Sequence, residues 1–343
     1  MKKKQVAISM GEPSGISSEI ILKCWLDRKK FSCDPFFVVD DIIKLESINR
    51  IFKLGAKIAT INCPEETKDV FNHSLPVLDI KKKIEFELGK PSPKNSSSVL
   101  FSIEKCVDLI LNKKASSMVT LPVCKASLIK AGFNYNGQTE FISHLIEKKV
   151  KRKFEEIMIM TTTQPLDKGK NLIVGLFTTH IPLSDFSQNL SINKIKKKIR
   201  VFENSLKKIW RIDNPKIGVC SINPHAGEKG LLGKEEVKII QPAIIALKKM
   251  NYNVDGPLSS DSCFFKDVRK NYDGIFCLYH DQGLIPVKML DFFNSVNVTG
   301  GLPITRVSPD HGPAFDISKK NIANTDSLKS SLKFLQQHCN DDF

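Results

Sequence analysis

Residues 6–39 read VAISMGEPSGISSEIILKCWLDRKKFSCDPFFVV and contain the unit that decides the fold. Short apolar runs at Val6–Ser9 and Phe36–Val39 predict two strands. Between them, Ser18–Leu26 has the apolar spacing of a helix, and Gly11-Glu-Pro-Ser-Gly15 provides a turn before it. A strand, a helix and a second strand in this order predict a parallel pair of strands joined by a crossover helix.

The same alternation continues along the 343 residues, without an internal repeat. Amphipathic spacing predicts further helices at 41–54, 98–111, 140–148, 193–209 and 235–250. Apolar runs predict further strands at 118–123, 157–160, 172–177, 217–222, 274–278 and 296–299. The strands at 157–160 and 172–177 are expected to form a hairpin across the polar turn 161–170. The expected fold is therefore α/β with a largely parallel sheet.

The composition is that of a folded protein with an excess of positive charge. Apolar residues make up 41% and charged residues 26%, which suits a chain with a sizeable core. The 52 Lys and Arg exceed the 37 Asp and Glu by 15, but only seven of them are Arg, the residue preferred for phosphate and base recognition. We therefore expect no nucleic-acid partner. Tight, salt-dependent binding of random DNA would support the opposite interpretation.

Cysteine usage and the N-terminus indicate where the protein works. The nine cysteines are scattered from Cys24 to Cys339 and form no Cys-x-x-Cys pair, which fits a reducing compartment. The first apolar run ends at Met10 and is too short for a signal peptide. No stretch approaches the ~18 apolar residues that cross a membrane. These features predict a cytoplasmic protein with no membrane partner.

Three of the seven histidines, His180, His225 and His280, each follow a predicted strand. In open α/β sheets, ligands bind at the carboxyl edge of the strands. A single histidine is usually a hydrogen-bonded surface residue, but three imidazoles at one edge suggest a metal site with an open coordination position. Asp281 and Asp261 are candidates to orient these imidazoles or to join them as ligands.

Several other polar residues could bind an anion. Lys288 follows His280 by eight residues, and Asn297 and Arg306 come soon after it. An ammonium, an amide and a guanidinium near one strand edge could hold a phosphate or a carboxylate. Thr139, in the polar loop before a helix, could cap that helix instead. The turn at residues 11–15 could approach an anion or be a plain strand-to-helix turn.

Seven short motifs together point to a family. The motifs are Gly11-Glu-Pro-Ser-Gly15, Gly137-Gln-Thr-Glu140, Thr178-Thr-His-Ile-Pro-Leu183, Asn223-Pro-His-Ala-Gly227, Tyr279-His-Asp-Gln-Gly283, Gly301-Leu-Pro303 and Asp310-His-Gly312. The joint occurrence of these motifs in this order is highly specific. By these motifs, the chain resembles the 4-hydroxythreonine-4-phosphate dehydrogenases of pyridoxal phosphate biosynthesis from its first strand to about Asp316.

The resemblance implies a fold and an assembly. The fold would be the two-lobed, three-layer αβα fold of the isocitrate/isopropylmalate dehydrogenases, without the GxGxxG Rossmann fingerprint. One lobe is expected to comprise residues 1–124 and 300–343, and the other residues 125–299 with the interface of a homodimer. The active site would lie in the cleft between the lobes. Ser92–Ser98, with loop composition, could mark a connection between lobes.

The resemblance also implies site residues. His180, His225 and His280 would bind a divalent metal (Zn, Mg or Co), with the last contributed by the other subunit. A small phosphorylated substrate would contact Gln138, Thr139, Lys288, Asn297 and Arg306. The family usually has His where this chain has Gln138. A glutamine can donate a hydrogen bond but cannot carry a positive charge or relay a proton. Another four-carbon phosphorylated hydroxy acid therefore stays open as the substrate.

The reaction implied by the resemblance is oxidation of 4-phosphooxy-L-threonine with NAD or NADP. The product, 2-amino-3-oxo-4-phosphooxybutanoate, would lose CO₂ to give 3-amino-2-oxopropyl phosphate. The metal would lower the pKa of the substrate hydroxyl. Lys288, as proton donor or acceptor, and Asp281 are the catalytic candidates. A metal-dependent hydrolase or aldolase at the same edge is the alternative, and formation of NAD(P)H distinguishes the two.

Overall fold

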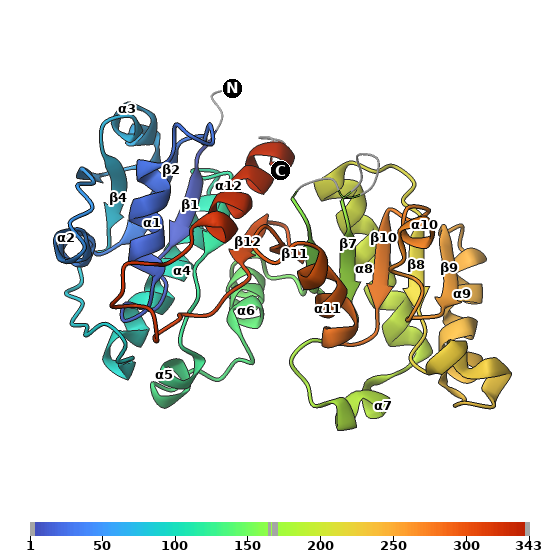
Figure 1. Cartoon of the computed structure of the whole chain (residues 1–343). Coiled ribbons are helices and arrows are strands. Elements are labelled where there is room, and N and C mark those ends of the chain that lie inside the picture. The colour runs from blue at the N-terminus through green and yellow to red at the C-terminus, as the bar shows by residue number, and fades with distance from the viewer. Residues whose placement is uncertain (1–3, 164–165, 167–170, 340–343) are drawn as a thin grey trace. The chain divides into compact units, whose positions relative to one another are not determined.

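The computed structural model describes residues 4–163, 166 and 171–339. It divides into two compact units (Figure 1). Unit 1 comprises Met1–Lys153 and Pro303–Phe343, and unit 2 comprises Phe154–Leu302. The middle of the chain thus forms one unit, and both ends form the other.

Six strands of unit 1 lie in the order β3-β4-β2-β1-β5-β12, and every neighbouring pair is parallel. The strands β1, β2 and β5 are almost completely buried, as expected where helices cover both faces of a parallel sheet. The strand bounds are β1 Val6–Ser9, β2 Phe36–Asp40, β3 Ile58–Ile61, β4 Leu75–Asp79, β5 Ser117–Thr120 and β12 Arg306–Pro309.

The helices of unit 1 form two layers. Helix α1 (Ser17–Leu26) leads from β1 to β2, and α4 (Ser96–Leu111) leads from β4 to β5, in the opposite direction along the sheet. Because such crossovers are right-handed, α1 and α4 cover opposite faces. Helices α2 (Ile42–Ile51) and α12 (Asp326–His338) pack beside α1, and α6 (Gln138–Val150) packs on α4. Two shorter helices are α3 (Thr67–Phe71) and α5 (Lys125–Lys130).

Six strands of unit 2 lie in the order β11-β6-β7-β10-β8-β9. The strands β7, β10, β8 and β9 are parallel, whereas β6 runs antiparallel to both β7 and β11. The hairpin of β6 and β7 confirms the predicted one, and its turn lies partly outside the described residues. The bounds are β6 Ile157–Thr161, β7 Ile173–Leu176, β8 Ile217–Cys220, β9 Val254–Leu258, β10 Gly274–Cys277 and β11 Val296–Gly300.

Helices α8 and α11 pack on opposite faces of β7 (Figure 1). A Cβ atom on Gly175 of β7 would lie 2.7 Å from the Phe202 ring of α8. On the other face, a Cβ atom on Gly283 of α11 would lie 2.6 Å from Val174. Glycine therefore allows both helices to approach the sheet closely, and unit 2 is also a three-layer αβα structure. The helix bounds are α7 Phe186–Asn189, α8 Ile192–Trp210, α9 Gln241–Lys248, α10 Lys266–Arg269 and α11 His280–Leu290.

The α/β class and the predicted elements are confirmed, with four differences. The boundary expected after residue 124 lies after residue 153, because α6 packs on α4 and keeps the segment 125–153 in unit 1. The other boundary, expected after residue 299, lies after residue 302. Ser92–Ser98 connects no lobes, since it lies within unit 1 and runs into α4. The helix expected at 235–250 begins with a π-helical turn, Glu236–Ile240. In the part of the chain described, no helix is long and apolar enough to span a membrane.

Candidate functional site

The three histidines lie at one edge of unit 2. Strands β7, β10 and β8 are parallel neighbours, so their carboxyl ends meet at the same edge. His180 follows β7, His280 is the first residue of α11 after β10, and His225 lies in the 3₁₀ turn after β8. The strand order therefore brings together residues that are far apart in the sequence.

His180 and His280 lie beside one another at this edge. Their ring centroids are 5.7 Å apart. An imidazole nitrogen binds Zn²⁺ at about 2.1 Å, so two rings on one ion have centroids up to about 6 Å apart. The Nδ1 atom of His280 is 2.7 Å from Oδ1 of Asp281. A carboxylate in this position orients the imidazole and leaves Nε2 as the nitrogen that can face a ligand.

His225 lies on a separate, exposed loop. Its neighbour Asp261 accepts a 2.8 Å hydrogen bond from the Ser259 hydroxyl. This hydrogen bond, with a smaller contribution from the charge of His225, lowers the pKa of Asp261. Within the described ranges, no group of three or more His, Cys, Asp or Glu side chains is assembled to hold a metal ion. The three-histidine metal site stays a prediction, with two imidazoles adjacent and the third on its own loop.

A pocket of about 310 Å³ opens at the histidine edge. The Thr178 hydroxyl, in its wall, donates a 2.9 Å hydrogen bond to the carbonyl oxygen of Leu278 and so joins the segments that follow β7 and β10. Burial raises the pKa of the Tyr279 hydroxyl. A small polar ligand would therefore meet both imidazoles and an uncharged phenol here. The pocket is lined by Thr178, Thr179, His180, Ile181, Pro182, Leu183, Phe186, Tyr279, His280 and Asp281.

Lys288 and Asn297 are not close to the histidines in one chain. Lys288 is eight residues further along α11 than His280, which is about 12 Å at a helical rise of about 1.5 Å per residue. Asn297 pairs with Met160 of β6, which in turn pairs with Val174 near the beginning of β7. Both residues thus lie toward the opposite end of the unit 2 strands from the histidine edge.

Arg306, Thr139 and Gln138 come together in unit 1. The Arg306 side chain donates from Nε to Oγ1 of Thr120 at 2.8 Å and from Nη1 to Oγ1 of Thr139 at 3.3 Å. Arg306 is 4% exposed, and this burial lowers the pKa of its guanidinium to about 10. Gln138 donates from Nε2 to the carbonyl oxygen of Leu121 at 3.0 Å. Thr139 does not cap α6, because Gly137 occupies the N-cap position.

This unit 1 cluster has the chemistry of an anion site. A guanidinium forms strong, charge-assisted hydrogen bonds to phosphate and carboxylate oxygens. Among the described residues, the Oε1 atom of Gln138 is buried without a hydrogen-bond partner. Thr120 could not be recognised from the sequence, because its only signal is its position as the last residue of β5.

The glycine-rich turn before α1 holds a buried acid. Glu12 is buried, and its backbone N–H donates to the carbonyl oxygen of Pro122 at 2.8 Å. Burial raises the pKa of the Glu12 carboxyl. A Cβ atom on Gly15 would lie 2.5 Å from the carbonyl oxygen of Pro313. The turn is therefore closely packed, and its acid is buried within the first of the seven motifs.

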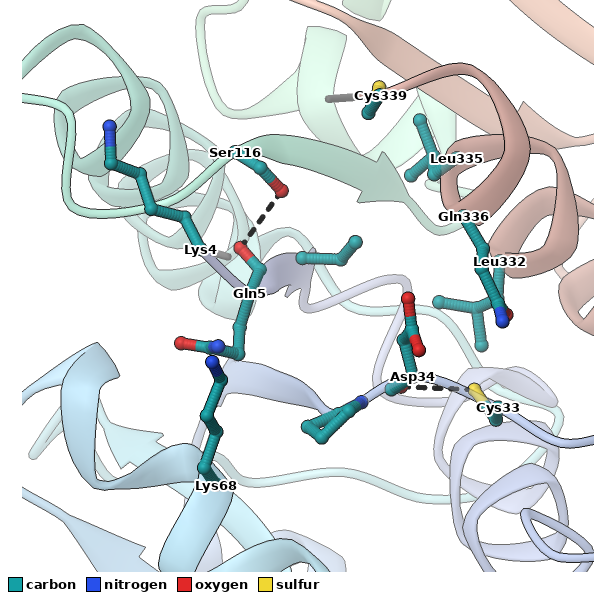
Figure 2. A pocket seen from close by; sticks show the side chains of 12 residues that line it. Lys4, Gln5, Cys33, Asp34, Lys68, Ser116, Leu332, Leu335, Gln336 and Cys339 are labelled. Carbon is teal, nitrogen blue, oxygen red and sulfur yellow. Dashed lines mark hydrogen bonds between the residues drawn. The ribbon is translucent and has the colours of Figure 1, made fainter. Parts of the chain in front are cut away.

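A second pocket, of about 180 Å³, lies at the edge where the amino ends of the unit 1 strands meet (Figure 2). Its walls include residues just before β1, β2 and β5, among them Lys4, Cys33 and Ser116. The Ser116 hydroxyl donates to the backbone carbonyl of Gln5 at 3.3 Å. Because parallel sheets bind ligands at the carboxyl edge, we place the candidate site at the histidine edge instead.

The structure is therefore that of a two-unit α/β protein with a pocket at the carboxyl ends of parallel strands. The chain belongs to the family described as pyridoxal phosphate biosynthetic protein PdxA, whose model matches residues 32–335. It is 38% identical to the 4-hydroxythreonine-4-phosphate dehydrogenase of Caulobacter vibrioides over 97% of both chains. The resemblance inferred from the seven motifs is confirmed.

Other comparisons agree. The chain is 36% identical to the 4-hydroxythreonine-4-phosphate dehydrogenase of Zymomonas mobilis, over 96% of this chain and 94% of that one. The crystal structure of the Klebsiella pneumoniae 4-hydroxythreonine-4-phosphate dehydrogenase superposes with a TM-score of 0.83 at 31% identity, over 97% of this chain and 99% of that one. A terephthalate 1,2-cis-dihydrodiol dehydrogenase from Burkholderia xenovorans shares the fold, with a TM-score of 0.61 at 20% identity, covering 97% of both chains.

Proposed function

We propose that this protein is a dehydrogenase that oxidises the hydroxyl of 4-phosphooxy-L-threonine with NAD or NADP. The product would be 2-amino-3-oxo-4-phosphooxybutanoate, which loses CO₂ to give 3-amino-2-oxopropyl phosphate. The observation that carries this proposal is the full-length similarity to relatives named 4-hydroxythreonine-4-phosphate dehydrogenase. The nicotinamide supplies the hydride acceptor when it is bound.

Arg306 and Thr139 would hold the anionic parts of the substrate. A buried guanidinium, already oriented by the hydroxyls of Thr120 and Thr139, needs little rearrangement to bind a phosphate or a carboxylate. Gln138 would accept a hydrogen bond from the substrate through its buried Oε1 atom. Lys288 and Asn297 would complete the polar contacts, with Lys288 also donating or accepting a proton.

A divalent ion (Zn, Mg or Co) would be held by His180, His225 and His280. The donor set fits, because three neutral imidazoles leave an open position. Within one chain the rings of His180 and His280 are already close enough to share an ion, so the other subunit need not contribute His280, as the resemblance had implied. Such an ion acts as a Lewis acid and lowers the pKa of a bound hydroxyl. Asp281 would keep the His280 ring oriented through its 2.7 Å contact with Nδ1.

The site would be shared between two copies of the chain. The end of α11 and the residues after it expose Met289, Phe292 and Phe293, which are 82%, 63% and 55% accessible. Apolar surface of this kind marks protein interfaces. The Nζ atom of Lys288 lies 5.6 Å from the centre of the Phe292 ring, so a subunit packed here would also cover Lys288. A shared site accounts for the separation of Lys288 and Asn297 from the histidines within one chain.

Two further points are part of the proposal. All nine cysteines are free thiols, which supports a cytoplasmic location. Because this chain has Gln138 where the resemblance leads us to expect a histidine, a different four-carbon phosphorylated hydroxy acid remains the alternative substrate.

The test is NAD(P)H formation by the purified protein with a panel of phosphorylated four-carbon hydroxy acids, with and without a chelator. We expect reduction of one cofactor with 4-phosphooxy-L-threonine, and loss of the rate in the chelator. Turnover without NAD(P)H formation would instead support a metal-dependent hydrolase or aldolase.

A further inference from the structure

We propose that Glu236 is a positioning residue that fixes the loop carrying His225 for binding of a divalent metal ion. The proposal rests on the proposed function, because it takes His225 as a metal ligand. No hydrogen bond described above joins Glu236 to any of the three histidines. Glu236 acts on the loop through its neighbour Asn223.

The loop needs such a support because its backbone is strained. From His225 to Lys229, five consecutive residues have positive φ, with values of 50°, 54°, 75°, 41° and 56°. Only one of them, Gly227, is a glycine. Left-handed backbone is unfavourable for residues with a Cβ atom and persists only where the surroundings hold it. His225 lies at the beginning of this stretch and is exposed, so its own side chain is not packed tightly enough to hold the loop.

Glu236 supplies hydrogen bonds to the residues that lead into the loop. Its Oε1 atom accepts from the backbone N–H groups of Ile222 and Asn223, both at 2.8 Å. Its Oε2 atom accepts from Nδ2 of Asn223, also at 2.8 Å. Glu236 is 2% exposed, so these bonds are shielded from water. The carboxylate thus fixes the backbone and the side chain of the residue two positions before His225.

The loop also packs closely around this carboxylate. A Cβ atom on Gly227 would lie 2.7 Å from Oε2 of Glu236, and one on Gly233 would lie 2.3 Å from Nδ2 of Asn223. Glu236 itself begins the π-helical turn Glu236–Ile240, and such turns frequently occur at functional sites. The close approach of Gly227, the close approach of Gly233 and the π-helical turn therefore all involve the pair formed by Asn223 and Glu236.

A carboxylate is required here, and an amide of the same size does not replace it. In Glu236→Gln, an NH₂ group would face the NH₂ group of Asn223. Asn223 cannot simply reverse its amide, because its Nδ2 atom also donates to Oε2 of Glu235 at 2.8 Å. If both acids become glutamine, Asn223 can reverse, and its Oδ1 atom can accept from both new NH₂ groups. The double variant E235Q/E236Q is therefore a designed rescue.

The test is titration of the purified full-length protein with Co²⁺, in which the visible absorption of the bound ion reports binding. Thermal unfolding of each variant measures its stability. Loss of a group that orients a metal ligand commonly weakens affinity by about 10–100-fold. We expect a loss in this range for Glu236→Gln, and recovery to within about threefold of the unsubstituted protein in E235Q/E236Q. The matched control is Glu203→Gln, which removes another buried glutamate of unit 2, paired at 2.9 Å with Lys207 on α8. This control is expected to change stability only.

The outcomes separate the two proposals. Absence of Co²⁺ binding by the unsubstituted protein contradicts the metal site of the proposed function itself. If the unsubstituted protein binds Co²⁺ and Glu236→Gln binds it equally well, the metal site stands and the role of Glu236 is wrong. Should the single variant fail to fold, the double variant decides: affinity close to that of the unsubstituted protein supports the role, and affinity as weak as that of His225→Ala contradicts it.

Discussion

The guanidinium of Arg306 donates a 3.3 Å hydrogen bond to the hydroxyl of Thr139, which joins the first residue of β12 to the first turn of α6. These residues are 167 positions apart in the chain. The same guanidinium is anchored by Thr120 at the end of β5. The proposed anion contact of unit 1 therefore depends on three separate segments that the sheet brings together.

The first prediction concerns this contact. Arg306→Lys keeps the charge but cannot reach both threonine hydroxyls and the substrate with one ammonium group. A charge-assisted hydrogen bond contributes about 1.5–3 kcal/mol, so we expect kcat/KM to fall by about 10–100-fold. Thr139→Ser, which keeps the hydroxyl, should lose much less than Thr139→Val. Steady-state kinetics of the three variants measure this, and equal rates for Ser and Val at position 139 would contradict it.

The second prediction concerns the metal. His225→Ala should lose bound metal and abolish turnover while the thermal unfolding midpoint changes little, because His225 lies on an exposed loop. Metal analysis of the purified variant, together with the NAD(P)H assay, provides the measurement. Full activity in a metal-free His225→Ala protein would exclude the metal-assisted mechanism.

The third prediction concerns substrate choice. Gln138→His introduces the residue that the family usually carries, which can hold a positive charge and relay a proton. We expect the variant to increase its preference for 4-phosphooxy-L-threonine over other phosphorylated four-carbon hydroxy acids by about tenfold, or about 1.4 kcal/mol. The ratio of kcat/KM values measures the preference. An unchanged ratio would mean that position 138 does not select the substrate.

The fourth prediction concerns self-association. Met289→Glu places a charge in the exposed apolar surface at the end of α11, where Met289 is 82% accessible. We expect the unsubstituted protein to sediment as a dimer and the variant as a monomer with little activity, because a charge is costly to bury in an interface. Ile43→Glu, at an exposed position on α2 of unit 1, is the control and should leave the dimer intact. A dimeric Met289→Glu protein would place the interface elsewhere.

The fifth prediction concerns pH. Burial raises the pKa of Glu12 above its usual value of 4.5, so the folded state binds this proton more readily than the unfolded state does. The ionised carboxylate therefore lowers stability, and this penalty grows as the pH rises from the usual value through the raised one. Glu12→Gln has no such proton. Its stability relative to the unsubstituted protein should rise as the pH increases above 4.5, as measured by urea unfolding. A pH-independent difference would contradict this.

Most of the fold could be predicted from the local pattern. That pattern did not predict β3, β4, β9, β12, α11, α12 or the shorter helices, and some of these have local reasons. Strand β4 contains Pro76, and β12 begins with the charged Arg306, so neither has the apolar pattern of a buried strand. Helix α11 contains Gly283 and Pro286, both of which weaken a helical pattern. Packing against the sheet keeps these segments in place, and the sequence alone does not contain that information.

The sequence by itself determined the alternation of strands and helices, the three histidines after strands, and the motifs of the family. These features are local, because strand and helix periods extend over only a few residues. Only the tertiary structure decided that β10 lies between β7 and β8, that His280 therefore lies beside His180, and that Arg306 meets Thr139. The same holds for Glu236, whose bonds to Asn223 depend on the path of a left-handed loop. Strand order, burial and hydrogen bonds between distant segments arise when the whole chain packs, and no short stretch of sequence specifies them.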